Sequence, residues 1–372
     1  MKILYICGTY CPSHGGAEIS MHTLLKFIKK DHNAQILVLT DYRYTQNKKK
    51  SYYDTISLLG TSYKERKNNI QKAIATFNPN LIITQLMWSD EALRIGKKNG
   101  IPTILRVCKI PFELNISKES KFSPTRLICV SKAVKKYVKE KWGRDCLIDI
   151  PAIELKRNIL VPKSKFVDPN KRKYITMFNP LVRKGGIVFK EISKKMPREK
   201  FATILGWSSL KETVKSKNFS NRLIKRICES QGTKFTGKKP HYANLSDCSN
   251  VIILKPDEKV WKIYSKTKIL LIPSQWEEAF GRVAIEGMAN GIPTIGSLTG
   301  GLKEAIGKGG ILVKEFSNSD KWLQKIKKLE NKKYYKNFSH KGIKWVKENY
   351  SLNKTVKNAF DFFGDTIKNK KI

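Results

Sequence analysis

The sequence predicts an α/β protein made of two doubly wound parallel sheets, and three observations support this prediction. First, short apolar runs bounded by Gly, Pro or Asn alternate along the chain with segments whose apolar residues recur at helical spacing, which is the pattern of βαβ units. Second, 372 residues are many for one hydrophobic core and enough for two domains. Third, residues 151–173 combine prolines and many charges without periodicity, as linkers do.

These observations divide the chain into four parts. We predict an N-terminal Rossmann-like domain over residues 1–155, a linker over 156–172 and a second Rossmann-like domain over 173–347. Residues 348–372 form a separate C-terminal helix.

In the first half, Lys2–Cys7 fits a strand better than a signal peptide, because the apolar run is brief and leads into a glycine. The apolar residues of Ala17–Lys29 share one helical face. Ser131 is suited to cap the start of a helix. The remaining predicted strands are Ala34–Leu39, Asn80–Thr84, Ile101–Val107 and Arg126–Val130, and the remaining helices are Tyr63–Phe77, Asp90–Asn99 and Lys132–Lys141.

In the second half, strands are predicted where short apolar runs stop at Pro, Gly or Asn, and helices where the period is near 3.6. The predicted strands are Tyr174–Phe178, Phe201–Leu205, Gln231–Gly237, Ile269–Ile272 and Ile292–Ile295. The predicted helices are Val260–Ser265, Val283–Ala289, Leu302–Ile306, Ser319–Leu329, Lys332–Asn349 and Leu352–Lys368.

The stretch Leu270–Val313 contains two glutamates at positions where a ligand could reach them. Glu278 follows a predicted strand, and Glu286 lies inside the first turns of the next helix. Ligands of open α/β sheets bind at the carboxyl ends of the strands, so two carboxylates here suit the hydroxyls of a polyol. Phe280-Gly281-Arg282 forms the corner, where free N–H groups favour a phosphate. The alternative is that both glutamates are solvated charges near a helix start.

Two further glycine pairs follow predicted strands. Arg183-Lys184-Gly185-Gly186 offers positive charge and close backbone approach to a diphosphate, although an ordinary basic turn is the alternative. Gly15-Gly16-Ala17-Glu18 starts a helix and could hold a phosphate or admit an acceptor, although a plain turn has the same pattern. The fingerprint G-x-G-x-x-G is absent there, which argues against a nicotinamide dehydrogenase.

The formal net charge of +42 has three readings. Lys, Asn and Ile are all abundant, as a biased genome would produce. Attraction to an anionic membrane surface is the second reading, with Tyr63–Phe77 as the best surface helix. Nucleic-acid binding is the third, but no nucleic-acid motif accompanies the charge.

Cysteine usage and hydropathy bear on location. The seven cysteines are scattered singly without a disulfide framework or zinc spacing, so we expect reduced thiols. No window of eighteen residues is apolar enough to cross a bilayer. We therefore expect a cytoplasmic protein, with peripheral binding at the cytoplasmic face of a membrane as an option.

The segment Glu278-Ala-Phe-Gly-Arg-Val-Ala-Ile-Glu286, with the following Gly-Met-Ala-Asn-Gly-Ile-Pro and Gly300-Gly301-Leu-Lys-Glu304, resembles the E-x7-E signature and tail of retaining family-4 glycosyltransferases. The "GGAE" at Gly15–Glu18 also occurs at this place in that family. The resemblance implies the GT-B fold, in which two Rossmann-like domains face each other across a cleft and the last helix crosses back onto the first domain.

The resemblance also implies an activity: transfer of a sugar from a UDP- or GDP-sugar to an acceptor hydroxyl, with retention, in glycan, polysaccharide or glycolipid synthesis. Glu278 would contact the donor sugar, and Lys184 and Arg183 would neutralise the departing diphosphate, which makes these three the catalytic candidates. The donor-binding candidates are Gly15, Gly16, Asn179, Gly206, Phe280, Gly281, Arg282 and Glu286, the last at the nucleotide ribose. No D-x-D motif is present, so we expect metal-independent transfer without a cofactor.

The sequence departs from the family at two places. Cys108 and Lys109 stand where the family usually has His, often followed by Asp, which leaves them and His14 as the acceptor-side candidates. Asn179 stands where an arginine is usual, and Arg183 or Arg282 could supply the missing charge.

Three functions are compatible with these observations. The first is an active glycosyltransferase, whose acceptor is a lipid-linked glycan, a surface polysaccharide or a small molecule. The second is a non-catalytic nucleotide-sugar- or glycan-binding relative, which the Cys108 substitution favours. The third is a nucleic-acid-binding α/β protein, which only the charge favours.

Overall fold

The computed structural model describes residues 1–8, 15–40, 55–58, 63–86, 88–110, 124, 126–155, 159–162, 171–204, 242–254, 257 and 259–369. The chain forms two compact units. Unit 1 comprises Met1–Glu154 and Tyr350–Ile372, and unit 2 comprises Leu155–Asn349. Each unit contains one parallel sheet with helices on its faces, which confirms the predicted fold class.

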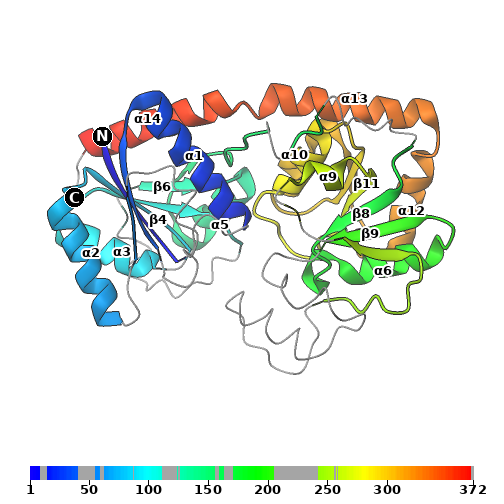
Figure 1. The fold of residues 1–372 in the computed structure, drawn as a ribbon, viewed down its shortest axis with the longest axis horizontal. Helices are drawn as coiled ribbons and strands as arrows, with labels where there is room; N and C mark the ends of the chain where they lie inside the picture. The colour runs from blue at the N-terminus through cyan, green and yellow to red at the C-terminus, as the bar shows by residue number, and fades with distance from the viewer. Residues whose placement is uncertain are drawn as a thin grey trace. The chain divides into compact units, whose positions relative to one another are not determined.

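The sheet of unit 1 has seven strands in the order β3-β2-β1-β4-β5-β6-β7, and every neighbouring pair is parallel. Figure 1 shows strands β4 and β6 of this sheet among the helices of unit 1. The order reverses direction beside β1, as in doubly wound sheets. The strands are β1 (Lys2–Cys7), β2 (Gln35–Thr40), β3 (Thr55–Leu58), β4 (Leu81–Gln85), β5 (Thr103–Val107), β6 (Arg126–Cys129) and β7 (Leu147–Ile148).

Helices cover both faces of this sheet, and the alternation of side chains along β1 shows why. Ile3 and Tyr5 point into one apolar cluster, with residues of α1 and α14, whereas Leu4 and Ile6 point into another, with residues of α2 and α3. The strands are therefore apolar along their whole length. The helices of unit 1 are α1 (Gly16–His32), α2 (Tyr63–Phe77), α3 (Ser89–Lys98), α5 (Lys132–Trp142) and α14 (Leu352–Lys368).

The last helix, α14, belongs to unit 1 although unit 2 precedes it in the sequence. Val356, Ala359 and Phe363 are fully or almost fully buried against the α1 side of the sheet. The ring of Phe360 also stacks on His32 at the end of α1, with the ring centroids 3.8 Å apart. The helical spacing of these residues explains the packing, because it places them on one face of α14.

The sheet of unit 2 has six parallel strands in the order β10-β9-β8-β11-β12-β13. The strands are β8 (Tyr174–Phe178), β9 (Lys200–Ile204), β10 (Val251–Leu254), β11 (Thr267–Ile272), β12 (Thr294–Ser297) and β13 (Ile311–Val313). The helices are α6 (Gly186–Lys195), α9 (Trp261–Tyr264), α10 (Arg282–Ala289), α11 (Leu302–Ile306), α12 (Ser319–Lys328) and α13 (Lys332–Asn349), with short 3-10 turns η5 (Val182–Lys184) and η7 (Gly307–Gly309).

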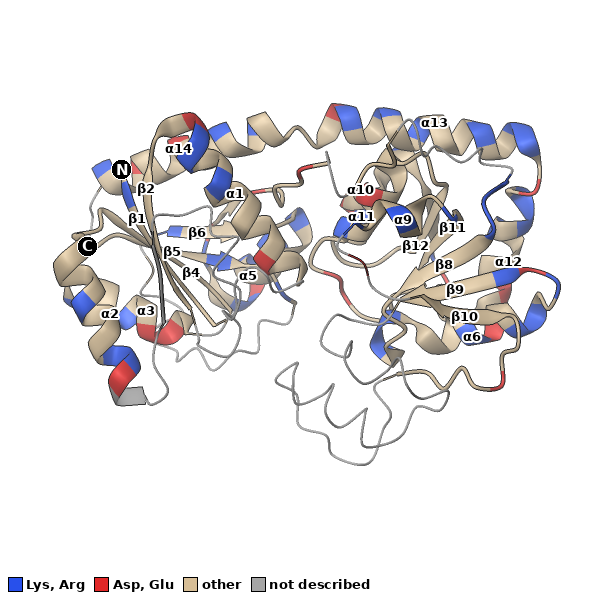
Figure 2. Ribbon diagram, in the orientation of Figure 1, with Lys and Arg blue, Asp and Glu red and all other residues tan. Residues whose placement is uncertain are grey.

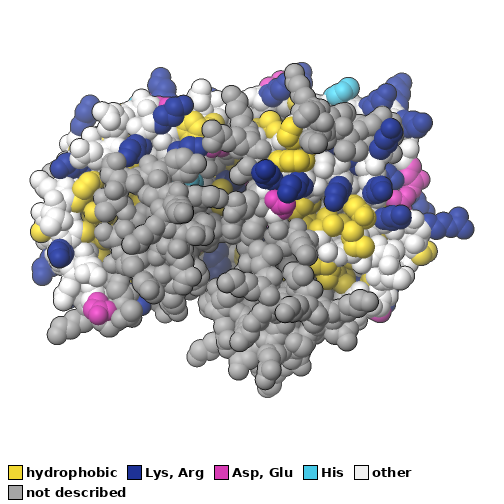
Figure 3. Space-filling model, viewed as in Figure 1, with side chains coloured by type: hydrophobic (Ala, Val, Ile, Leu, Met, Phe, Trp, Pro, Cys, Tyr) yellow, Lys and Arg dark blue, Asp and Glu magenta, His cyan; other side chains and the backbone are white. Residues whose placement is uncertain are grey.

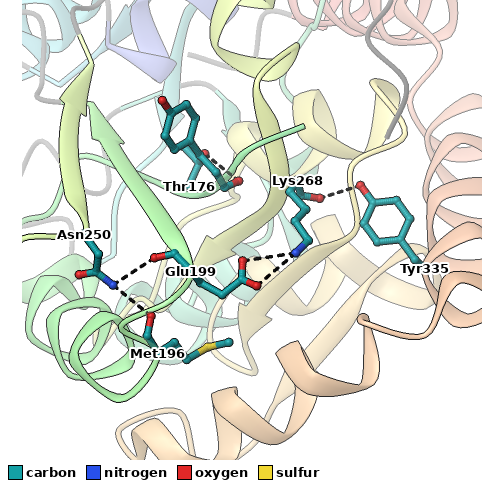
Figure 4. Close-up of polar contacts among 7 residues, drawn as sticks. Thr176, Met196, Glu199, Asn250, Lys268 and Tyr335 are labelled. Carbon is teal, nitrogen blue, oxygen red and sulfur yellow. Dashed lines mark hydrogen bonds and ion pairs between the residues drawn. The ribbon is translucent and has the colours of Figure 1, made fainter. Parts of the chain in front are cut away.

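Polar contacts at the amino-terminal ends of the strands tie the helices to this sheet (Figure 4). The Asn250 amide donates to the carbonyl oxygens of Met196 and Glu199, at 3.0 and 3.1 Å, and so closes the turn between α6 and β9. Lys268 of β11 pairs with the Glu199 carboxylate, and the Tyr335 hydroxyl of α13 donates to the Lys268 carbonyl at 2.7 Å. This end of unit 2 is therefore structural, and the opposite, carboxyl ends carry the candidate residues.

Several predicted boundaries differ from the structure. Strands β3, β7, β10 and β13 were not predicted. The middle residues of β10 are exposed at the edge of the sheet, so its apolar run does not mark a buried strand. The run predicted as Ile292–Ile295 forms a strand only from Thr294, because the Ile292 N–H donates to Gly287 and closes α10. The predicted strand Gln231–Gly237 lies outside the described residues.

Part of the predicted linker packs against unit 2. Ile159 and Val161 contact the apolar cluster around Tyr264 and Leu270 in unit 2. The amide of Asn290 donates to the Ile159 carbonyl at 3.0 Å and its side-chain oxygen accepts from the Val161 N–H at 2.8 Å.

The expectation of reduced thiols throughout is wrong, because Cys129 and Cys146 form a disulfide. Cys129 ends β6 and Cys146 directly precedes β7, and the parallel pairing of the two strands brings their Cα atoms to 6.0 Å. Neither cysteine was identifiable from spacing, since sheet pairing brings them together. No described helix combines the length and apolar character that crossing a bilayer requires.

The burial of α14 generates a stability prediction. Replacing Phe363, whose side chain is completely buried, with Ala should destabilise unit 1 by about 3–5 kcal/mol through lost burial and the cavity left behind. That loss should lower its Tm by roughly 10 °C in thermal unfolding monitored by circular dichroism. Lys357→Ala, on the exposed face of the same helix, is the control and should change Tm little. Equal effects of the two substitutions would contradict the packing of α14 on unit 1.

Candidate functional site

The central carboxylate, Glu278, lies on the loop that follows β11. Its Oε1 accepts a hydrogen bond from the Ser274 hydroxyl at 2.8 Å and lies 3.7 Å from the Lys184 ammonium nitrogen. The Glu278 side chain is 14% exposed, so it is largely buried yet reachable from solvent. A carboxylate held in this way at the carboxyl end of a central parallel strand has the position of a ligand-binding group.

Two glycines hold the backbone of this loop. The Gly301 N–H donates to the Glu278 carbonyl at 2.6 Å. A Cβ at Gly300 would lie 2.4 Å from that carbonyl, and a Cβ at Gly301 would lie 2.3 Å from the Ala279 carbonyl. Gly300 also has φ +46°, which favours glycine. The absence of side chains at both glycines therefore allows the start of α11 to contact the loop backbone. This contact holds the backbone of Glu278 in place.

The basic turn after β8 reaches the same place. β8 and β11 are neighbours in the sheet, so the residues after them meet at one edge. The Gln275 N–H donates to the Arg183 carbonyl at 2.9 Å, and a Cβ at Gly185 (φ +87°) would lie only 1.8 Å from the Pro273 carbonyl. This contact places Lys184 against Glu278. The structure thus brings together the three predicted catalytic residues, Glu278, Lys184 and Arg183.

The electrostatics of Glu278 follow from this arrangement. Burial acts to raise its pKa, but the Lys184 charge, the Ser274 hydrogen bond and the nearby Trp276 and Arg183 act to lower it, and the result is a pKa below the ordinary value. Trp276 contributes through its indole N–H, which acts on this carboxylate. Glu278 is consequently ionised at neutral pH. Its partner, the Lys184 ammonium group, is able to bind the anionic group of a ligand instead.

The second carboxylate, Glu286, lies in α10 and is also engaged. Its Oε2 accepts from the buried Tyr264 hydroxyl at 2.8 Å, and its Oε1 lies 3.3 Å from the Arg282 guanidinium. The side chains of Glu286 and Arg282 are 12% and 10% exposed. These contacts orient the carboxylate and neutralise Arg282.

The corner before α10 turns on a glycine. Gly281 has φ +110° and stands at the start of the helix without a side-chain cap, and a Cβ there would lie 2.5 Å from Leu302. Phe280 is buried. Asn179, at the end of β8, has φ +59°, and its side-chain oxygen is buried without a hydrogen bond in the described part of the chain. It carries no charge, so its side chain adds no positive charge at the end of β8.

The predicted residues of unit 1 follow β1 and β5. Gly15 and Gly16 begin α1, where the Glu18 carboxylate lies so close that a Cβ at Gly15 would be 2.0 Å from it. Cys108 and Lys109 follow β5. Burial raises the pKa of the Cys108 thiol to about 12, so it is neutral at physiological pH and unsuited to act as a base. His14 and Gly206 lie outside the described residues.

A buried polar group in unit 1 was not predicted. Arg106 of β5 donates to Gln85 at 3.0 Å and to Ser20 at 2.8 Å, and lies 3.9 Å from the Asp149 carboxylate. Burial raises the pKa of Asp149 to about 6, although the Arg106 charge acts to lower it. The sequence feature that could have indicated this group is Arg106 itself, an arginine inside an otherwise apolar predicted strand. In unit 2, the residues that were not predicted are Ser274, Tyr264 and Trp276. Only the structure shows that they contact Glu278, Glu286 and Arg183, respectively.

The glycine contact generates a prediction with a matched control. Gly301→Ala should destabilise unit 2 by about 1–3 kcal/mol, because the new methyl overlaps the loop backbone. Gly364→Ala adds the same methyl group to α14, where nothing lies within 4 Å, and should stabilise unit 1 by about 0.5–1 kcal/mol. Urea denaturation of both variants measures the difference. A neutral Gly301→Ala would show that the loop does not depend on this approach.

The lowered pKa of Glu278 generates a pH prediction. Its contribution to stability is fully present above the unfolded pKa of about 4.3 and is lost as pH falls through the lower folded pKa. The free-energy difference between the wild type and Glu278→Gln should therefore be larger at pH 6 than at pH 3 in chemical denaturation. Glu348→Gln, on the exposed side of α13, should show almost no difference at either pH. A difference that stays constant for Glu278→Gln would refute the lowered pKa.

Comparison with known proteins shows which sequences resemble part of this chain. Residues 220–345 match the family model described as "Glycosyl transferases group 1". D-inositol 3-phosphate glycosyltransferase of Corynebacterium jeikeium (strain K411) is 37% identical over 87 residues, which cover 23% of this chain and 20% of that relative. The chain therefore aligns with about a fifth of that relative's length.

Solved structures extend the likeness to the whole chain. The glycosyltransferase from Rickettsia africae ESF-5 has a TM-score of 0.73 at 18% identity over 99% of both chains. HepE from Anabaena, in complex with UDP-glucose, has a TM-score of 0.74 at 14% identity over 98% of this chain and 100% of that one. The chain thus has the GT-B fold, and residues 220–345, which include both glutamates, match the group 1 glycosyl transferase family.

Proposed function

We propose that this chain is a retaining glycosyltransferase that moves a sugar from a nucleoside-diphosphate donor to an acceptor hydroxyl. The observation that carries the proposal is the ionised Glu278, held by Ser274 beside Lys184 at the carboxyl end of β11. A buried carboxylate paired with a solvent-reachable cation provides one acceptor for sugar hydroxyls and one positive charge for a phosphate. The match of residues 220–345 to the group 1 model supports the same activity.

The reaction breaks the bond between the anomeric carbon and the diphosphate oxygen and forms a bond to the acceptor oxygen, whose proton passes to the departing diphosphate. Negative charge grows on the departing diphosphate, and stabilising that charge lowers the barrier. Lys184 and Arg183 supply positive charge from the turn after β8, and N–H groups at Gly281 add dipoles. Because these groups supply the charge, we propose transfer without a metal or cofactor, and activity should persist in EDTA.

Glu286 is proposed to accept hydrogen bonds from the ribose hydroxyls of the nucleotide. Tyr264 and Arg282 fix its carboxylate by contacts of 2.8 and 3.3 Å. Such preorganisation reduces the entropy lost on binding. HepE forms complexes with UDP and UDP-glucose, so UDP-sugars are the first donors to test and GDP-sugars the second.

The acceptor is proposed to be a glycan, a lipid-linked glycan or a small molecule. Exposed lysines favour an anionic surface such as the cytoplasmic face of a membrane, and Figure 2 shows them along α12 and α13. In the view of Figure 3, Lys and Arg side chains are spread over both units rather than gathered at one point. The exposed lysines of these helices are Lys327, Lys328, Lys332, Lys333, Lys336, Lys341, Lys344 and Lys347.

One observation favours a second candidate function. Cys108 is a neutral thiol where a histidine is usual, so the chain could bind nucleotide-sugars without transferring the sugar. Incubation with a UDP-sugar and a panel of acceptors separates the two functions, because only an enzyme releases the free nucleoside diphosphate.

The experiment that tests donor binding is thermal unfolding with a panel of UDP, GDP and ADP. A nucleotide at a hundredfold excess over its Kd stabilises the folded state by about 2.7 kcal/mol, which should raise the Tm of unit 2 by roughly 5–10 °C. Glu286→Ala should abolish this shift, whereas Glu348→Ala, on exposed α13, should retain it. No shift with any nucleotide would remove the basis of the proposal.

A further inference from the structure

Arg183 and Trp276 form a contact that the proposed function does not by itself explain. The Arg183 guanidinium carbon lies 4.6 Å from the centroid of the Trp276 ring. Arg183 comes from the turn after β8 and Trp276 from the loop after β11, and the Gln275 N–H bond to the Arg183 carbonyl joins the two at the backbone. An arginine from one loop is thus stacked on an aromatic ring from the next.

The stack limits where the Arg183 charge can be. Arg183 is an exposed residue, and a free arginine side chain loses up to about 2 kcal/mol of rotamer entropy when a ligand immobilises it. A planar guanidinium over an indole ring is attracted electrostatically and is already ordered before a ligand arrives. The ring therefore prepares Arg183 for an anion beside Glu278.

The other candidate cation for this role is already used. Arg282 pairs with Glu286 one helical turn away, and its side chain is only 10% exposed. Asn179 leaves the end of β8 uncharged. Among the described residues, Lys184 and Arg183 are consequently the cations next to Glu278, and Arg183 is the one without a carboxylate partner at ion-pair distance.

Trp276 also faces the carboxylate of the site. Its indole nitrogen is buried, and its N–H acts to lower the pKa of Glu278. Trp276 and Arg183 both act on the Glu278 carboxylate, which places the stack at the site itself.

We infer that Trp276 is a positioning residue that holds Arg183 against the diphosphate of the donor. This inference rests on the proposed function. It adds that the Arg183–Trp276 stack makes the site prefer nucleoside diphosphates over monophosphates.

The test compares the affinities of the chain for UDP and UMP by isothermal titration calorimetry. The wild type should prefer UDP. Trp276→Leu, which removes the ring, should weaken UDP binding by about tenfold and leave UMP binding unchanged. Trp276→Phe keeps an aromatic face and should restore most of the preference. Arg183→Ala should cause a similar selective loss, and combining it with Trp276→Leu should add little, because both remove one interaction.

Arg198→Ala is the matched control, since Arg198 is an exposed arginine of the same unit in the turn before β9. It should leave the UDP-to-UMP ratio unchanged. If the wild type binds UDP but Trp276→Leu binds it equally well, or loses UDP and UMP affinity in equal measure, the inference is overturned while the proposed function stands. If the wild type binds neither UDP nor GDP, the proposed function itself fails.

Discussion

The structure of unit 2 depends on a backbone contact between Gly300–Gly301 and the loop that carries Glu278. The Gly301 N–H reaches the Glu278 carbonyl at 2.6 Å, and neither glycine has space for a Cβ. A second close approach, of Gly185 to the Pro273 carbonyl, joins the turn after β8 to the same loop. Since main-chain contacts are less adaptable than long side chains, they fix the position of Glu278 against Lys184 to within the tolerance that a binding site requires.

The two glutamates are eight residues apart, yet their environments differ. Glu278 faces Lys184, whose side chain is 31% exposed, so its partner can turn to an incoming anion. Glu286 faces Tyr264 and the largely enclosed side chain of Arg282, which fix it as an oriented acceptor. This difference supports the separate tasks that we propose for them: the first would couple sugar and phosphate binding, and the second would present oxygen atoms to hydroxyl groups. The same reasoning separates the arginines, because Arg282 is neutralised by its own helix whereas Arg183 is held by an aromatic ring.

Local patterns predicted most of the fold. Apolar runs such as Tyr174–Phe178 and amphipathic segments such as Leu352–Lys368 needed no long-range information, because their period and end signals are contained in the segment. The strands missed were those with weak local signals: β10 is exposed in its middle, and β7 has two residues. The Cys129–Cys146 disulfide was missed for a related reason, since only the pairing of β6 with β7 brings the cysteines together.

The sequence by itself determined that two α/β units are present, that Glu278, Lys184 and the glycine pairs follow strands, and that Glu286 lies in the next helix, since those facts follow from spacing along the chain. Only the tertiary structure decided which of these residues meet. Lys184 and Glu278 are far apart in sequence and touch because β8 and β11 are neighbours in the sheet. The same adjacency stacks Arg183 on Trp276, and α9 brings Tyr264 to Glu286. Strand order is set by the packing of whole elements, and no local pattern contains it.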